Sequence, residues 1–435
     1  MFSILFPQWP VRVFTLAVLL GLSSFQSSGA TALPADAAGP PASDSSCDWT
    51  EPDGNTAYPE THARYFRLAL PRSRTRGLRL RIDGHYLAAR YFSYQLYGSA
   101  FNAIDVLSDH RIQPNPGSQS PLTGITRIDP AIRPGGQYTV YVVFADRPAH
   151  PAPNTLYAGA SALPIGRNYL FLRAYLSNGV VPLPVIRYER DDGSPAQDSP
   201  IERSACADGS QPPSLKLRRT AVNDDGPLPA LRLGGQQAGS PLPAAPGRDV
   251  PFEVYRPSRV LGSGVVYNQD AGFMSARIEN RNELVLVRFR APSFPALRGP
   301  VVPEVRYWSL CQNRQLLQTV IACVADRDAI IDASGFFHAV IGDFGGRPPG
   351  ADARHGFSYL PNAGLVDNGF LIYRQLLSRP GFGGAITSVP PGASPQTVLG
   401  DYSPQATTCP RALFTARSLA GDSAAQVYAA CRAAR

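Results

Sequence analysis

The sequence predicts an all-β protein: two tandem antiparallel jelly-roll-like β-sandwich modules, a long Pro/Gly-rich linker between them and a short C-terminal helix. Of the 435 residues, 10% are aromatic and only 17% are charged, a mixture that favours strands over helices. The 43 prolines and 39 glycines punctuate the chain as expected for short strands joined by turns. Five short apolar segments also recur in the same order in the two halves.

The N-terminus has the parts of a secretory signal peptide. Arg12 supplies the positive region, residues 13–22 form an unbroken apolar run, and Ala30-Thr31-Ala32 fits the small-residue cleavage pattern. An uncleaved membrane anchor is the alternative, but the apolar run is far shorter than the ~20 residues that a spanning helix needs. We therefore expect a signal peptide at 1–32, an N-terminal extension at 33–60, no transmembrane segment after cleavage, and a secreted or periplasmic location.

The five recurring segments are the strongest pattern in the sequence. The matched segments are residues 65–70 with 273–278, 80–82 with 287–289, 90–93 with 306–309, 136–142 with 335–341, and 169–177 with 370–378. Each is rich in aromatic and β-branched residues and is bounded by turn formers, which is the pattern of a strand. Because turns and not helices separate them, an antiparallel sandwich is favoured over a parallel α/β sheet. The modules are predicted at 61–184 and 261–385.

The rest of the chain is predicted to be less regular. Residues 185–260 are dense in Pro, Gly, Ser and Asp and are expected to form an irregular linker. Residues 386–435 form a C-terminal tail, in which Asp422 or Ser423 can cap a short helix that runs through Ala430.

Six cysteines in an oxidising compartment predict three disulfides. Proximity suggests one bond across a hairpin, one within the C-terminal segment and one from the mature N-terminus to the linker. The expected pairs are Cys311 with Cys323, Cys409 with Cys431, and Cys47 with Cys206. A zinc site is the alternative, but no two cysteines have the short spacing of zinc ligands, so no metal is expected.

The formal net charge of +8 comes from arginine, because Lys216 is the only lysine. Arginines such as Arg79, Arg81, Arg288 and Arg290 alternate along the expected strands and form no localised basic face. A localised face is the mark of nucleic-acid binding, so no nucleic-acid partner is expected.

Four arginines are candidate binding residues. Strand alternation places Arg90 and Arg306 on an apolar face of their strands, at the rim if that face is the core. Either the stem packs there while the charged head stays in water, or the head contacts an anion or a sugar at the mouth of the sandwich. Arg173 and Arg374 are a second pair related by the repeat.

No catalytic residue is predicted. Gly421-Asp422-Ser423 is similar to an esterase nucleophile block, but no histidine follows it and a helix cap explains it. Asp105, Asp109 and His110 form a cluster, loosely matched by residues 326–328, that could supply the paired carboxylates of a glycosidase. Turn capping and surface pairing explain both clusters better, and no cofactor is expected.

Both modules resemble the C-terminal β-sandwich of a two-domain bacterial envelope family that carries a domain-of-unknown-function label. The residues that carry the resemblance are 91–97, 136–144 and 169–175 in the first module, and 307–310, 335–341, 359–361 and 370–373 in the second. The resemblance implies a jelly-roll-like sandwich and an envelope location, and it implies no reaction. The sequence departs from the family pattern by repeating this module where a different N-terminal domain is expected.

These features together favour an exported, non-enzymatic protein that binds an envelope polymer or protein, or serves a structural role. The alternative is a secreted hydrolase that acts on a glycan or an ester. A hydrolase would require the modules to differ, with a histidine and an acid converging in a cleft of one of them.

Overall fold

The computed structural model describes residues 49–52, 55–71, 77–129, 131–159, 167–177, 179–194, 196, 248–256, 266–278, 283–295, 302–364 and 368–434. The expected signal peptide at 1–32, Cys47, Cys206 and most of the expected linker lie outside the described residues. Ser45–Arg435 forms one compact unit that contains both predicted modules.

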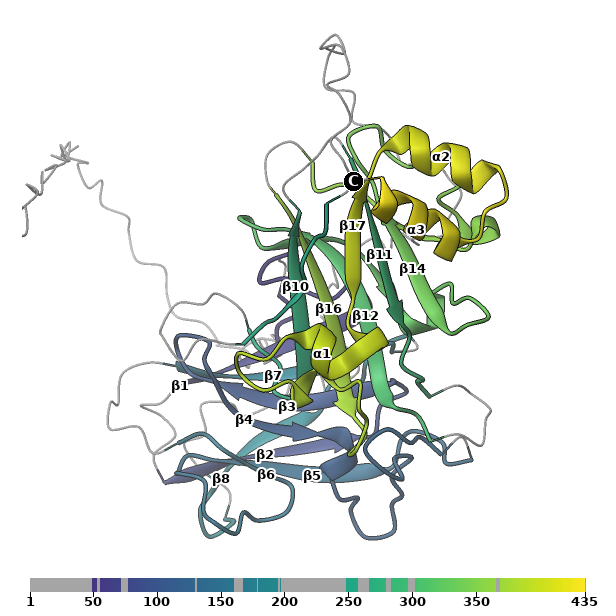
Figure 1. Cartoon of the computed structure of the whole chain (residues 1–435). Coiled ribbons are helices and arrows are strands. Elements are labelled where there is room, and N and C mark those ends of the chain that lie inside the picture. Colours follow the sequence, from purple (N-terminus) through teal and green to yellow (C-terminus); the bar gives the residue numbers. More distant parts are fainter. Residues whose placement is uncertain are drawn as a thin grey trace, which may run out of the picture. The chain divides into compact units, whose positions relative to one another are not determined.

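The first half of this unit is a sandwich of two four-stranded sheets, seen as two layers in Figure 1. Its strands are β1 (Ala63–Pro71), β2 (Leu78–His85), β3 (Tyr91–Tyr97), β4 (Ala103–Ser108), β5 (Gln137–Val143), β6 (Thr155–Tyr157), β7 (Arg167–Tyr175) and β8 (Val185–Arg190). The sheets have the orders β1-β7-β3-β4 and β6-β5-β2-β8. Alternate residues such as Leu80, Ile82, Val140 and Val142 point inward and are fully buried between the layers.

The second half has the same strand order with one strand added. Its strands are β9 (Glu253–Val254), β10 (Ala271–Ile278), β11 (Leu284–Arg290), β12 (Val305–Arg314), β13 (Thr319–Ala325), β14 (Phe336–Ile341), β15 (Ser358–Leu360), β16 (Gly369–Ser378) and β17 (Gln405–Cys409). The sheets run β13-β12-β16-β10-β9 and β15-β14-β11-β17. The all-β sandwich prediction is confirmed, although β5 with β6 and β14 with β15 pair in parallel.

The register of the sheets corrects one of the matched segments. Val140 pairs with Ile82, and Ala339, its counterpart in the repeat, pairs with Val287. Ile82 therefore corresponds to Val287 and not to Phe289. The difference is two residues, which leaves the inward and outward alternation of a strand unchanged, so the hydrophobic pattern does not detect it.

Both sandwiches extend past the boundaries expected from the sequence. Strand β8 lies in the segment expected to be linker, and β17 lies in the expected tail. At the N-terminal side, Thr50 pairs with Arg67 along the edge of β1, just as Glu253 of β9 pairs with Ser275 of β10. These edge segments are at most six residues long, too short for a clear alternation of their own.

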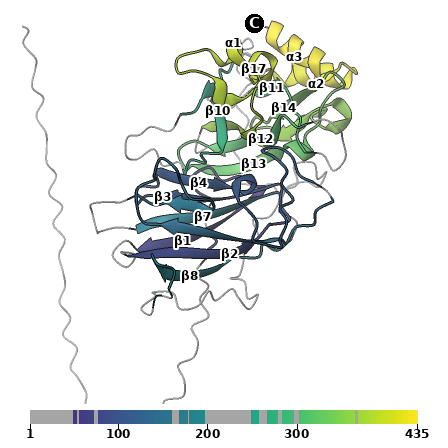
Figure 2. The same ribbon diagram turned by 90° about the horizontal axis from the view of Figure 1, so that it is seen from below.

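Three α-helices lie in the C-terminal part of the chain: α1 (Pro395–Leu399) between β16 and β17, and α2 (Arg411–Leu419) and α3 (Ala424–Ala433) after β17. The predicted C-terminal helix is α3, and Ser423 caps it in a capping box with Gln426. Helices α2 and α3 cover the outer face of the sheet that contains β17, β11 and β14 (Figures 1 and 2). Within the described ranges, no helix is both long and apolar enough to cross a membrane.

Short 3-10 turns connect several strands. They are η2 (Asp109–Arg111), η3 (Asp326–Asp328), η4 (Ala353–His355), η5 (Ile386–Ser388) and η6 (Gly400–Tyr402). The first two follow equivalent strands, β4 and β13, and each begins with a buried aspartate.

Two of the expected disulfides are present in the structure. Cys311 and Cys323 lie directly opposite each other on β12 and β13, with their Cα atoms 4.0 Å apart. Cys409 and Cys431 join β17 to α3.

Replacing both Cys311 and Cys323 with serine is expected to lower the melting temperature by several degrees. The bond closes a loop with a sequence separation of 12, and releasing such a loop costs roughly 3 kcal/mol of stability. Thermal unfolding followed by far-UV circular dichroism measures the change, and the β-sheet spectrum at low temperature should be preserved. An unchanged melting temperature would show that the bond does not stabilise the sandwich.

Candidate binding site

The outer faces of β7 and β16 carry equivalent arginines. On β7, Leu172 and Ala174 point into the sandwich core, so Arg173 points away from it. On β16, Arg374 has the same place, because each arginine lies opposite a serine of the neighbouring strand. Outward side chains are normally exposed, yet Arg173 is 2% exposed and Arg374 is 3% exposed.

The arginines are buried because the outer faces of the two sheets cover each other. A separate apolar cluster joins them: Ala63, Tyr91, Tyr175, Leu176, Ala271, Tyr307, Ala325, Leu376 and Leu377. The rings of Tyr175 and Tyr307 meet edge to face at 5.3 Å between centroids. This contact buries one face of each sandwich against the other.

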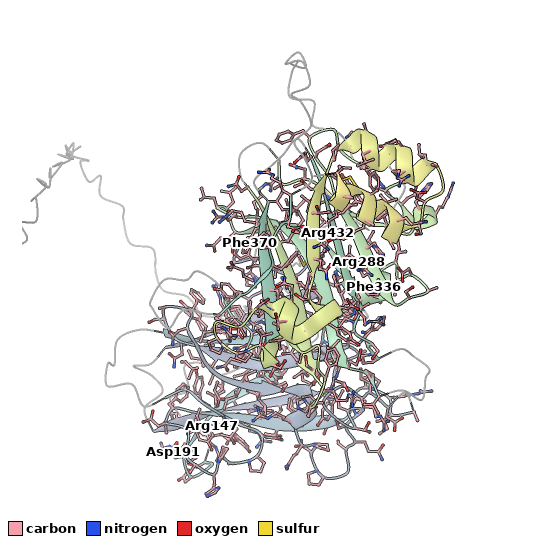
Figure 3. The ribbon with its side chains drawn as sticks, in the orientation of Figure 1. Arg147, Asp191, Arg288, Phe336, Phe370 and Arg432 are labelled. Atoms are coloured by element: carbon pink, nitrogen blue, oxygen red, sulfur yellow. A yellow bond between two sulfur atoms is a disulfide. The ribbon has the colours of Figure 1, made fainter. Side chains whose placement is uncertain are left out.

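A cavity of about 700 Å³ lies next to this contact. Its walls come from the outer faces of β1, β7, β10 and β16, and from the segments that precede β1 and β10. Aromatic rings and guanidinium groups dominate the lining, including Phe171, Arg173, Tyr175, Phe273, Phe370 and Arg374. Phe370 is labelled in Figure 3 on the second sandwich.

Arg374 has a carboxylate partner. Its Nη1 lies 3.3 Å from Oε2 of Glu60, which is 1% exposed. Ser309 donates its hydroxyl to the same oxygen, and His62 Nδ1 lies 3.0 Å from Glu60 Oε1. His62 also reaches Asp328, at 3.4 Å. The cluster therefore contains two basic and two acidic groups.

Two pKa values in this cluster are shifted strongly. Burial by itself raises the pKa of a carboxyl group, but the charge of Arg374 and the hydrogen bonds from His62 and Ser309 lower the pKa of Glu60 to about 2. Burial by itself lowers the pKa of an imidazole, but hydrogen bonds to Asp328 and Glu60 raise the pKa of His62 to about 9. Both groups are charged at neutral pH.

Arg173 has no carboxylate partner among the described residues. Its Nη1 donates to Gln95 Oε1, and its Nη2 donates to the Tyr97 hydroxyl and to the carbonyl of Val266. The guanidinium also lies over the rings of Tyr97 and Phe171, 5.2 and 5.6 Å from their centroids. A buried charge with only neutral partners is costly.

Arg90 and Arg306, the other two predicted binding residues, do not line the cavity. Arg306 of the second sandwich lies 3.2 Å from Asp109 of the first, and Arg90 of the first lies 3.1 Å from Asp326 of the second. Arg306 is fully buried and also donates to the carbonyl of Ile125. These arginines thus bridge the sandwiches, and the expected place at a solvated rim is wrong for Arg306.

The two aspartates are also buried, which corrects the expectation of surface pairing. Each is 1% exposed and accepts a hydrogen bond from a strand amide of its own sandwich, Asp109 from Phe92 and Asp326 from Trp308. Burial raises the pKa of Asp326 to about 6 against the opposing charge of Arg90.

The two acids of the first cluster, which could have supplied the paired carboxylates of a glycosidase, each pair with an arginine. Asp105, near Asp109 in the sequence, pairs instead with Arg147 at 2.7 Å.

Sequence reasoning missed Glu60 and Asn268, which precede β1 and β10. Residue 60 was expected to end an N-terminal extension. A signal was available, because Glu60 lies five residues before Tyr65 and Asn268 lies five residues before Phe273, the first residues of two matched segments. Extending the match upstream would have paired them.

No family model and no curated protein matches this chain. Among solved structures, an uncharacterised protein from Burkholderia cenocepacia aligns at 14% identity and a TM-score of 0.42, covering 77% of this chain and 80% of that one. A Vibrio parahaemolyticus protein aligns at 9% identity and a TM-score of 0.35, covering 75% and 89%. The B domain of a biofilm-associated protein aligns at 8% identity and a TM-score of 0.19, covering 76% and 71%. Likeness at this level names no ligand or partner for the chain.

Proposed function

We propose that this is an exported, non-enzymatic binding protein whose cavity holds a small, mostly apolar molecule with a negatively charged group. The observation that carries the proposal is Arg173, a buried guanidinium that lines the cavity and has no carboxylate partner among the described residues. Anions are the groups that satisfy such a charge most strongly.

The remaining lining suits an apolar body. A volume of about 700 Å³ lies in the range of small-molecule sites, which are mostly hydrophobic with a few polar groups that orient the ligand. Phe171, Phe273, Phe370 and Ile372 provide the apolar contacts. Glu51, an acid of the lining, is paired with Arg64 at 2.8 Å.

The proposal also includes export of the protein and an origin of its two sandwiches by duplication. The secretory pattern of residues 1–32 and the two disulfides support a secreted or periplasmic protein. The matching strand orders support an origin of the sandwiches by duplication of one module. Under this proposal, one binding site arises where two copies of the same sheet face meet.

Binding of an apolar anion is expected to depend on Arg173. The probe is 8-anilinonaphthalene-1-sulfonate, a fluorescent apolar anion, and we expect it to bind one site per chain. Arg173→Met should weaken this binding about 10- to 100-fold, because a hydrogen bond to a charged group contributes ~1.5–3 kcal/mol. The uncharged probe N-phenyl-1-naphthylamine should bind both forms within about twofold. Fluorescence titration measures both.

Arg187→Met is the matched control, since Arg187 lies on β8 and its side chain is 62% exposed. This variant should bind both probes as the unaltered protein does. Equal loss of both probes in Arg173→Met, or no one-to-one binding of either probe to the unaltered protein, would contradict the proposal.

A further inference from the structure

Resting on the proposed function, we infer that the ligand is a monocarboxylate whose carboxylate binds Arg173 as Glu60 binds Arg374. Asn268, which has no carboxylate of its own, leaves Arg173 available to the ligand. Asn268 would then determine specificity for a carboxylate ligand.

Glu60 and Asn268 hold equivalent positions. The carbonyl of Glu60 accepts the amide of Ala63, at the start of β1, and the carbonyl of Asn268 accepts the amide of Ala271, at the start of β10. Each side chain also accepts an amide two residues further on: Glu60 Oε1 from His62 and Asn268 Oδ1 from Asp270. The chain therefore follows the same path at both places.

In the second half, the Glu60 carboxylate faces two buried donors. These are the guanidinium of Arg374 and the hydroxyl of Ser309, which lies opposite Arg374 on β12. The same two donors exist in the first half as Arg173 and Ser93, which lies opposite Arg173 on β3.

Neither donor of the first half pairs with a carboxylate of the described ranges: an asparagine stands where the glutamate would be, and the carboxylate of Asp270, two residues further on, accepts the hydroxyl of Tyr91. Among the described residues, the fully buried hydroxyl of Ser93 has no hydrogen-bond partner. Arg173 donates three hydrogen bonds to neutral groups, out of five N–H donors in a guanidinium. Within this described structure, Arg173 and its strand neighbour Ser93 thus both lack a carboxylate acceptor, and Arg173 lines the cavity together with Asn268.

The charges of the lining indicate a single negative charge on the ligand. Four arginines line the cavity. Arg64 is paired with Glu51 and Arg374 with Glu60, while Arg67 is partly exposed and can be solvated by water. Only Arg173 is buried without a carboxylate in the described part of the chain. A second negative charge on the ligand would meet Glu51 of the lining.

The test compares Asn268→Glu with Asn268→Gln. The probes are 1-pyrenebutyrate, a monocarboxylate, and 1-pyrenebutanol, its uncharged analogue. The unaltered protein should bind the carboxylate at least tenfold more tightly than the alcohol. Asn268→Glu supplies an internal carboxylate to Arg173, so it should remove this preference, while binding of the alcohol changes less than about threefold.

Asn268→Gln is the matched control, because glutamine has the size of glutamate without its charge. It should keep most of the preference for the carboxylate. At neutral pH, the melting temperature of Asn268→Glu should also exceed that of Asn268→Gln, since Arg173 and Ser93 gain an acceptor.

The outcomes separate the inference from the proposed function. If neither pyrene probe nor the anilinonaphthalene probe binds the unaltered protein, the proposed function fails. If the probes bind but Asn268→Glu and Asn268→Gln behave alike, only the inference is overturned. A lower melting temperature of Asn268→Glu relative to Asn268→Gln would likewise overturn it.

Discussion

Replacing Arg306 with methionine is expected to lower the free energy of unfolding by about 3–5 kcal/mol, the cost of leaving a buried charge without its partner. Arg306 is fully buried, and its removal leaves Asp109, which is 1% exposed, without a cation. The carbonyls of Gly124 and Ile125 lose their donor as well. Urea unfolding followed by tryptophan fluorescence measures the loss.

Two further variants test whether the ion pair is the cause. Arg187→Met breaks a surface pair with Asp83 and should cost less than about 1 kcal/mol. The double variant Arg306→Met with Asp109→Asn should recover part of the loss, because no unpaired charge remains buried. A loss below 1 kcal/mol in Arg306→Met would mean that the bridge does not hold the sandwiches together.

Glu60→Gln is expected to have a comparable effect, about 3–5 kcal/mol, because Arg374 is 3% exposed and loses its carboxylate partner. Glu51→Gln is the matched control, since Glu51 is partly exposed in its pair with Arg64 and should cost less than about 1 kcal/mol. Urea unfolding at neutral pH compares the two variants. Equal stability of the two variants would contradict the role of Glu60.

The same cluster predicts a pH dependence of stability. The pKa of His62 is raised from 6.5 to about 9, so its contribution is fully present below pH 6.5 and is lost as the pH rises through about 9. The pKa of Glu60 is lowered from 4.5 to about 2, so its contribution is present above pH 4.5 and is lost as the pH falls through about 2. In Glu60→Gln, the decline between pH 6.5 and 9 should be shallower, because His62 loses one of the carboxylates that hold its proton. If stability declines equally in Glu60→Gln and in the unaltered protein, Glu60 does not raise the pKa of His62.

Features that depend on residues close together in the sequence could be predicted from the sequence. Alternation of apolar residues predicts β12, the capping position of Ser423 predicts α3, and hairpin geometry predicts the Cys311–Cys323 bond. Strand β8 and helix α2 were not predicted, because pairing with β2 stabilises β8, and packing on a sheet stabilises α2, more than a strong pattern of their own.

The sequence determined the all-β fold, the repeated order of strands and which arginines are equivalent in the two halves. Only the tertiary structure decided what those arginines do. Arg306 finds its aspartate 197 residues away and Arg90 finds its aspartate 236 residues away, in the other sandwich. An alternating pattern shows which side chains leave the core of a sheet, but not whether water or another sheet covers them. The burial of Arg173 beside an asparagine, and of Arg374 beside a glutamate, follows from the contact of the two sheets.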